Sequence, residues 1–299
     1  MTSNYDKNLA KAHVFIECLP YVKKFHGKTI VVKYGGNAMI NEKLKEAVFK
    51  DLVLMNLIGI RTVLVHGGGP DIEDYLQRLD IKSDFKSGLR VTDEAVMETV
   101  SMVLVGKVNQ NIVSAVNGLG GKAVGLSGKD GAMLKCHKKY AKIQQPQGVT
   151  SVDIGMVGEV ESVDCKLIND LLADDYIPII SPIGTDDQGG TYNVNADYAA
   201  GKIAAALGAE KLFLLTDVEG ILRDFQDKDS LISVIKASEM PQLIQDKVIN
   251  KGMIPKVESC MNAIEGGVGG VHIIDGRVEH SLLLELFTDS GVGTMVVGD

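Results

Sequence analysis

Hydrophobic and polar positions follow two alternating periods along the chain, and these periods predict strands separated by helices. Short apolar runs rich in β-branched residues are typical of buried strands, and they occur at 30–32, 62–65, 123–126, 178–181, 211–215 and 270–274. Apolar residues at helical spacing predict helices at 42–57, 93–118, 164–174 and 197–207. Thr92 or Asp93 is placed to cap the second of these helices. Strands alternating with helices predict an α/β fold with a mainly parallel sheet covered on both faces.

Two segments interrupt this rhythm and suggest a division into lobes. Glycines and β-branched residues at 152–160 favour a hairpin, and the prolines within 177–184 favour a hinge. We therefore predict an N-terminal lobe at 27–180 and a C-terminal lobe at 181–299. Residues 1–26 carry apolar positions at helical spacing, and this pattern leaves open whether the helix packs on its own domain or against another subunit.

Composition narrows the class of function. The chain has 299 residues and a net charge of −8, without a basic run, which argues against nonspecific nucleic-acid binding. No signal-peptide pattern is present and no apolar run approaches the ~18 residues needed to span a membrane, so no membrane partner is expected. The four cysteines form no C-x-x-C pair, which favours a reducing, cytoplasmic setting.

Two strand ends carry the residues expected of a phosphate site. In the segment 29–36, the apolar run leads to Lys33, which is followed by the pair Gly35 and Gly36. The segment 61–66 is followed by the glycines 67–69. Lysine is a compact cation suited to phosphate oxygens, and glycines let the backbone approach a ligand closely. A single Lys-Gly-Gly is often only a turn, but two such strand ends favour function. Neither a Walker A sequence nor a G-x-G-x-x-G after a strand is present.

Charged residues further along the chain add to this site. Asp197, near a helix start, could simply cap that helix, or it could hold Lys33 and Lys256 in place. Lys256 also lies near a helix start, where a positive charge is unfavourable unless an anion binds there. Arg90 is the best candidate for a substrate carboxylate because its planar fork binds both oxygens.

Other residues are less informative. The turn after 211–215 is acidic and contains glycine, so it is either a plain turn or a contact for ribose, phosphates or magnesium. The histidines show no metal-ligand spacing, and no metal site is predicted. His66 is interpreted either as structural or as a residue that supports a ligand-contacting neighbour.

Five motifs together resemble the amino acid kinase family over nearly the whole chain, and within it the members that phosphorylate N-acetyl-L-glutamate. They are VVKYGGNAM at 31–39, VLVHGGGP at 63–70, GLRVTD at 88–93, NVNAD at 193–197 and GMIPK at 252–256. The resemblance implies an open three-layer αβα sandwich whose N-terminal lobe binds N-acetyl-L-glutamate and whose C-terminal lobe binds ATP with Mg²⁺. It also implies phosphorylation of the γ-carboxylate to N-acetyl-L-glutamyl 5-phosphate in arginine biosynthesis. The alternatives are a kinase of another small acidic amino acid and a non-catalytic arginine-sensing protein.

The same resemblance implies roles for individual residues. Lys33 and Lys256 would stabilise the transferred phosphoryl group, and Asp197 would orient both. The substrate would be held by Gly68 and Gly69 at its γ-carboxylate, and by Arg90 and Asn193 at its α-carboxylate. The implied nucleotide contacts are Asp217, Val218, Glu219, Gly220, Ile221, Leu222, Lys251, Gly252 and Met253. A carboxylate is already ionised at neutral pH, so no general base is needed.

Two terminal segments resemble the arginine-inhibited members of the family. These are YVKKFHG at 21–27 and the region 272–294. The resemblance implies a homo-oligomer, a hexamer built as a trimer of dimers, joined by the N-terminal helix. It also implies that L-arginine binds near His272, Glu285, Gly291 and Gly293, and it leaves open whether a PII signalling protein docks.

Overall fold

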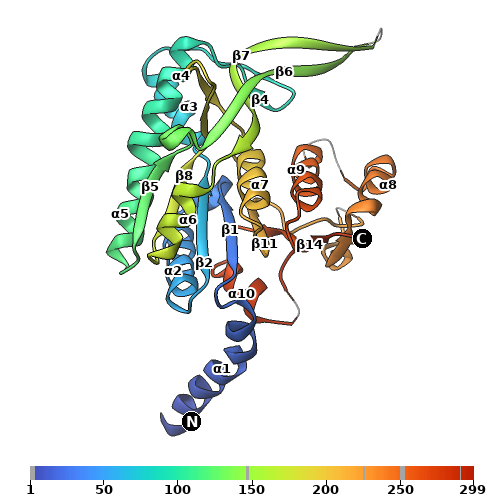
Figure 1. Cartoon of the computed structure of the whole chain (residues 1–299). Helices are drawn as coiled ribbons and strands as arrows, with labels where there is room; N and C mark the ends of the chain where they lie inside the picture. The colour runs from blue at the N-terminus through green and yellow to red at the C-terminus, as the bar shows by residue number, and fades with distance from the viewer. Residues whose placement is uncertain (1–3, 146–147, 225, 250–252, 290) are drawn as a thin grey trace.

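One open sheet forms the centre of the molecule, and helices cover both of its faces (Figure 1). The computed structural model describes residues 4–145, 148–224, 226–249, 253–289 and 291–299. Among these residues the sheet has eight strands in the order β12-β14-β13-β11-β1-β2-β8-β5. All pairings are parallel except that of β13 with β14. The predicted three-layer α/β fold is therefore confirmed.

Every strand predicted from the apolar runs is present in this sheet, and two further strands extend one edge. The predicted strands are β1 (Thr29–Tyr34), β2 (Arg61–His66), β5 (Ala123–Ser127), β8 (Ile177–Ser181), β11 (Lys211–Thr216) and β13 (Val271–Asp275). The additional edge strands are β12 (Val234–Lys236) and β14 (Thr294–Val297). The sheet continues across the predicted lobe boundary, because β1 pairs with β2 on one side and β11 on the other. The division into lobes stays a prediction.

Helices pack on the two faces in two separate apolar cores. The first core includes residues of α2, α3, α4, α5 and α10, and the second includes residues of α6, α7, α8 and α9. Side chains alternate between the faces of a strand, so Ile30 and Val32 of β1 enter the first core and Val31 enters the second. The helices are α1 (Asn4–Phe25), α2 (Glu42–Leu57), α3 (Gly69–Arg78), α4 (Glu94–Ser101), α5 (Gln110–Gly118), α6 (Lys166–Ala173), α7 (Ala196–Ala206), α8 (Met240–Gln245), α9 (Ile254–Glu265) and α10 (Ser281–Phe287).

Two predicted helices differ in detail from their pattern. The long helix at 93–118 is capped by Asp93, whose side chain accepts a hydrogen bond from the N–H of Val96, but its middle, η2 (Met102–Asn109), is π-helical. The suggestion that Asp197 caps α7 is wrong. The cap is Asn195, whose side chain accepts the N–H groups of Asp197 and Tyr198, which leaves the Asp197 carboxylate available for other partners.

A second sheet is built on a long hairpin, as the glycine-rich pattern indicated. Its strands are β6 (Leu134–Gln145), β7 (Gly148–Val163), β9 (Ile183–Thr185) and β10 (Thr191–Asn193), and β3 (Phe85–Lys86) and β4 (Leu89–Arg90) form a small separate pair. Short 3-10 turns are η1 (Gly36–Met39), η3 (Asp130–Ala132), η4 (Lys228–Ser230) and η5 (Ala237–Glu239).

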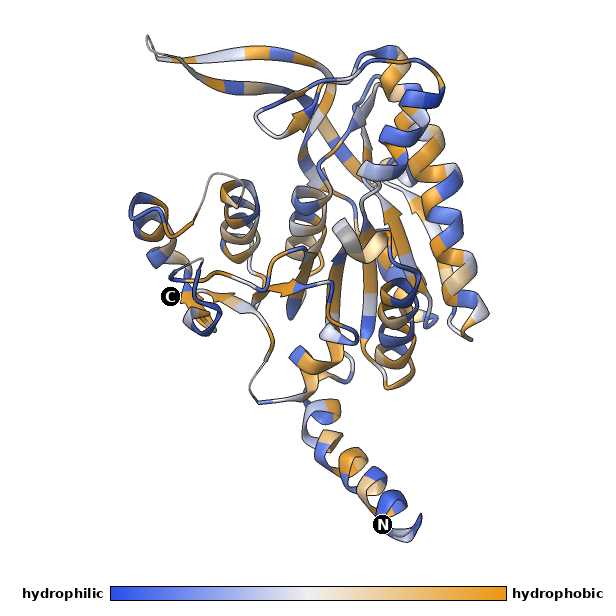
Figure 2. Cartoon of the chain, turned by 180° about the vertical axis from the view of Figure 1, so that it is seen from behind, coloured by the Kyte–Doolittle hydropathy of each residue, from blue (hydrophilic) through white to orange (hydrophobic). Residues whose placement is uncertain are grey.

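Helix α1 projects away from the sheet, and only its end is packed (Figures 1 and 2). Phe25 is buried. The ring of Tyr21 packs edge to face against that of Phe287, with the two ring centres 6.2 Å apart. The rest of the helix exposes the apolar side chains of Leu9, Val14, Phe15, Ile16 and Leu19. Within the described residues, no helix combines the length and apolarity that crossing a bilayer requires.

Candidate active site

Three charged side chains from three elements meet above the carboxyl end of the central strand. Lys33 is near the end of β1, Asp197 is in the first turn of α7, and Lys256 is in the first turn of α9. The Lys256 Nζ donates a hydrogen bond to Asp197 Oδ2 at 3.0 Å, and the Lys33 Nζ forms an ion pair with Oδ1 at 3.0 Å. The structure thus brings together the two lysines and the aspartate that the sequence singled out.

Burial and charge act in opposite directions on Asp197. Burial raises the pKa of its carboxyl group, but the charges of Lys33 and Lys256 lower it more, so that the pKa falls to about 2. The carboxylate is therefore ionised at neutral pH, and the triad carries two positive charges against one negative charge. This excess of positive charge suits a bound anion.

The glycines after β1 lie against the side chains of Lys33 and Asp217. A Cβ at Gly35 would lie 2.5 Å from the Nζ of Lys33, and one at Gly36 would lie 2.6 Å from Oδ1 of Asp217. Gly36 also has a φ of +68°, which residues with a Cβ rarely adopt. The absence of these side chains lets Lys33 and Asp217 come close to the same turn.

On one side of Lys33, the residues predicted to hold the substrate line a single cavity of about 190 Å³. Its walls include Gly68, Gly69, Arg90 and Asn193. Arg90 is buried, with its guanidinium 2.9 Å from Glu73 Oε2. Its charge also lies 4.5 Å from the centre of the Phe85 ring. The Asn193 Nδ2 donates to the Thr92 hydroxyl at 3.2 Å.

On the other side, the predicted nucleotide contacts also line one cavity, of about 680 Å³. Asp217, Val218, Glu219, Gly220, Ile221, Leu222 and Met253 are all in its wall. The other two, Lys251 and Gly252, lie outside the described residues. Three cations that sequence reasoning missed, Lys228, Lys247 and Arg277, share this wall. Nothing in their local sequence separates them from ordinary surface charges.

The residues predicted to contact arginine form a compact cluster at β13, α10 and the turn before β14. His272 Nδ1 lies 2.7 Å from Glu285 Oε1, and the N–H of Val292 donates to Oε2 at 2.6 Å. A Cβ at Gly291 would lie 2.8 Å from Glu285 Oε2, and one at Gly293 would lie 2.3 Å from a backbone oxygen of β13.

Lys211, which sequence reasoning missed, completes this cluster. Its Nζ lies 2.5 Å from His272 Nε2, and burial lowers the pKa of Lys211 to about 8. Burial would raise the pKa of Glu285, but the hydrogen bonds from His272 and from the Val292 N–H bring it below its usual value. Burial also lowers the pKa of His272.

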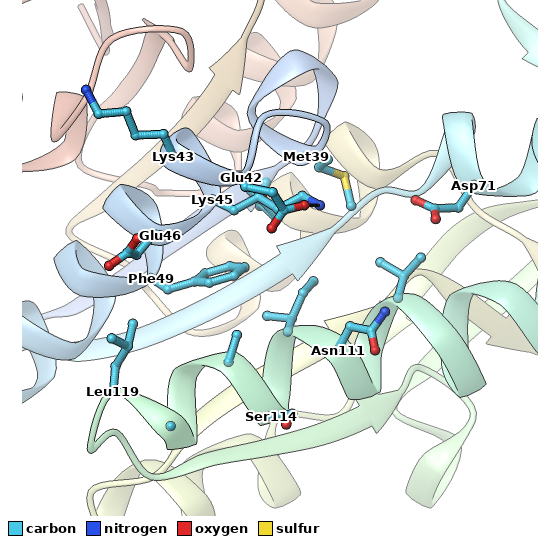
Figure 3. A pocket seen from close by; sticks show the side chains of 15 residues that line it. Met39, Glu42, Lys43, Lys45, Glu46, Phe49, Asp71, Asn111, Ser114 and Leu119 are labelled. Carbon is cyan, nitrogen blue, oxygen red and sulfur yellow. Dashed lines mark hydrogen bonds and ion pairs between the residues drawn. The ribbon is translucent and has the colours of Figure 1, made fainter.

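A further cavity is separate from all three sites. It has a volume of about 800 Å³ and lies between α2 and α5, with Glu42, Lys45, Asp71 and Asn111 in its wall (Figure 3). None of the residues predicted to bind substrate, nucleotide or arginine lines it. In the described part of the chain, no group of three or more His, Cys, Asp or Glu residues is placed to hold a metal ion.

Comparison with known proteins agrees with this arrangement. The model of the amino acid kinase family matches residues 28–275. An acetylglutamate kinase from Pelotomaculum thermopropionicum is 57% identical over 287 residues, which is 96% of this chain and 97% of the relative. An acetylglutamate kinase from Heliobacterium modesticaldum is 55% identical over 97% of this chain and 99% of its own.

Solved structures give the same fold. The N-acetylglutamate synthase from Neisseria gonorrhoeae, complexed with coenzyme A and N-acetyl-glutamate, has a TM-score of 0.81 at 27% identity. The match covers 96% of this chain and 63% of the synthase chain. The same synthase complexed with coenzyme A and L-arginine has a TM-score of 0.76 at 26% identity. Fold and site therefore define an α/β phosphotransferase. The chain belongs to the amino acid kinase family, which confirms the resemblance drawn from its motifs.

Proposed function

We propose that the chain transfers the γ-phosphoryl group of ATP to the γ-carboxylate of N-acetyl-L-glutamate, forming N-acetyl-L-glutamyl 5-phosphate in arginine biosynthesis. The observation that carries this proposal is the pair of lysines on Asp197 between the two cavities. In the sheet, β1 lies between β2 and β11. Lys33 therefore stands between the glycine turn after β2, which lines the smaller cavity, and the Asp217 turn after β11, which lines the larger one.

Each cavity suits the ligand proposed for it. The smaller one offers the Arg90 guanidinium, the Asn193 amide and a backbone turn without side chains, which match a compact dicarboxylate. The larger one combines apolar side chains such as Val248 and Ile249 with the cations Lys228 and Lys247, which match a base and its phosphates.

The reaction joins two anions, so catalysis consists mainly of positioning and of neutralising charge. The substrate carboxylate attacks the γ-phosphorus, and the bond from phosphorus to the β,γ-bridging oxygen breaks with release of ADP. Lys33 and Lys256 would contact the oxygens of the transferred group, while Asp197 keeps both ammonium groups in place. When bound with ATP, Mg²⁺ neutralises part of the phosphate charge.

A coupled assay of ADP release tests this proposal. With ATP and Mg²⁺, we expect turnover with N-acetyl-L-glutamate and little with free L-glutamate or L-aspartate. Preference for a free amino acid would assign the chain to another substrate within the family. A complete lack of ADP release with every acceptor would favour the non-catalytic arginine-sensing alternative.

We also infer that L-arginine inhibits the enzyme by binding at Glu285 and His272, and that α1 joins copies of the chain. The synthase of similar fold has been solved with L-arginine, and Glu285 is a buried carboxylate suited to a guanidinium. The exposed apolar side chains of α1 are suited to a second copy of that helix.

Two measurements test this inference. Arginine should lower turnover of the wild type, and Glu285→Gln should weaken that inhibition while turnover without arginine is retained. Equal inhibition of both proteins would contradict the site. Light scattering should give an oligomer that Phe15→Glu reduces to a smaller species, and a wild-type monomer would contradict the role of α1.

A further inference from the structure

A buried histidine and asparagine lie directly behind the glycine turn of the smaller cavity. His66 ends β2, Asn109 ends the π-helical segment η2, and both are almost fully buried. Asn109 Nδ2 lies 2.8 Å from the backbone oxygen of Ile179 and 3.2 Å from His66 Nε2. On its other side, His66 Nδ1 lies 2.7 Å from the carbonyl oxygen of Gly67.

These partners fix the protonation of His66. A carbonyl oxygen can only accept a hydrogen bond, so the proton must be on Nδ1, and an amide nitrogen can only donate, so Nε2 must be bare. One neutral tautomer meets both demands. Burial, which lowers the pKa of His66 to about 4, also keeps the ring neutral at physiological pH.

The hydrogen bond from His66 fixes the orientation of the next peptide group. In a trans peptide the C=O and the following N–H point in opposite directions, and the described residues contain no cis peptide. Because the Gly67 carbonyl points to His66, the Gly68 N–H points away from His66. Both glycines line the smaller cavity. Within the described part of the chain, no backbone or side-chain acceptor is recorded for this N–H.

The π-helical segment places the Asn109 side chain in contact with both His66 and Ile179. Its side chain reaches across the sheet to β8 and the end of β2, and a Cβ at Gly125 of β5 would lie only 2.0 Å from its Oδ1. A π-helical insertion changes the direction in which the following side chains project, and such insertions often occur at functional sites.

We propose that His66, held by Asn109, is a positioning residue that aims the Gly68 N–H at the carboxylate that accepts the phosphoryl group. This rests on the proposed function, because it needs the smaller cavity to be the acceptor site. A fixed donor toward a carboxylate costs no reorganisation when charge shifts in the transition state. His66 and Asn109 therefore affect substrate affinity and turnover without contacting the substrate.

Two substitutions test the roles of Nδ1 and Nε2 of the His66 ring separately. In His66→Asn the amide nitrogen takes the place of Nδ1 and can still donate to Gly67, whereas in His66→Gln the amide takes the place of Nε2 and that donor is lost. Titration calorimetry should show N-acetyl-L-glutamate binding weakened about tenfold or more in His66→Gln, with ADP binding within about twofold of wild type. His66→Asn should retain most of the affinity. Equal losses in both variants, or no loss in His66→Gln, would overturn the proposal.

Asn117→Ala is the matched control. Asn117 lies on the same long helix and also bonds backbone groups of a sheet strand, at Ala123, but away from the cavity. It should lower the melting temperature without changing either affinity. A purely structural role of His66 would give His66→Gln this same profile.

Two further observations keep the test decisive. In the unaltered protein, ¹⁵N NMR should show His66 neutral with its proton on Nδ1 from pH 5 to 8, and a proton on Nε2 would overturn the proposal even if the variants fail to fold. Arg90→Met in the same titration distinguishes a wrong cavity assignment from a wrong role for His66. If it binds N-acetyl-L-glutamate as the wild type does, the cavity assignment itself fails; if it loses binding while His66→Gln does not, only the positioning role fails.

Discussion

Lys33 and Lys256 approach opposite oxygens of one carboxylate, each with its Nζ 3.0 Å from Asp197. One negative charge between two positive charges leaves a net positive charge at a point where all three side chains are mostly buried. Like charges this close repel each other more strongly than they would in water. A phosphoryl group entering between the lysines would supply the missing negative charge, so the site is most stable when an anion is bound.

We therefore predict that Lys33→Ala and Lys256→Ala each lower kcat by on the order of 100-fold or more. Each removes a cation from the transferred group, and folding should be little affected because Asp197 keeps one partner. Steady-state kinetics and thermal unfolding measure both effects. Lys28→Ala, which breaks an exposed ion pair with Glu210, is the control and should leave kcat unchanged. Turnover close to wild type in either active-site variant would refute the assigned roles.

Arg90 supports a second prediction, about the substrate. Arg90→Met should raise the KM for N-acetyl-L-glutamate by about tenfold to 100-fold, because a charged hydrogen bond to the α-carboxylate is lost, and the KM for ATP should stay the same. Arg78→Met is the control, since Arg78 lies on α3 in an exposed pair with Asp74. An equal rise in both KM values would indicate that Arg90 serves the fold through Glu73 instead.

The fold and the triad could be predicted because they depend on local pattern and strand order. Lys33 lies near the end of the buried strand β1. In a parallel sheet the carboxyl ends of neighbouring strands share one edge, so the turns after β1, β2 and β11 converge. The π-helical turn ending at Asn109 could not be predicted, since the apolar spacing looks the same with or without it. The ion pair of Arg90 with Glu73 could not be predicted from the sequence either, because it depends on how α3 packs against β4. The same holds for Lys211, which meets His272 only through strand pairing.

The nucleotide cavity supports a third prediction, at Gly220. Its φ is +143°, and a Cβ there would lie 2.7 Å from both Leu231 Cδ1 and Thr294 Oγ1. Gly220→Ala should therefore displace this turn and raise the KM for ATP by about tenfold, with the KM for N-acetyl-L-glutamate unchanged. Gly189→Ala is the matched control, because Gly189 also has a positive φ, +81°, but has open space around it. If both variants change the KM for ATP alike, the turn does not contact the nucleotide.

His66 supports a prediction about pH. Its pKa is about 4 in the folded protein against 6.5 for an unburied histidine, so between these values the unfolded chain binds more protons than the folded one. The stability contributed by the neutral ring is complete above pH 6.5 and is lost as the pH falls toward 4, by up to about 3 kcal/mol. Urea unfolding of the wild type and of His66→Asn should therefore give free energies of unfolding whose difference changes by this amount across the window.

Two comparisons isolate the contribution of His66. Burial raises the pKa of Asp51 to about 6, so this group titrates in the same window, but it does so in both proteins and cancels in the difference. Asn117→Ala should shift the stability curve downward by a similar amount at every pH, because no titrating group is removed. A difference between wild type and His66→Asn that stays constant from pH 6.5 to 4 would mean that His66 takes up its proton at the same pH in the folded and unfolded chains. The ring would then not be held in the neutral tautomer that orients the Gly67–Gly68 peptide.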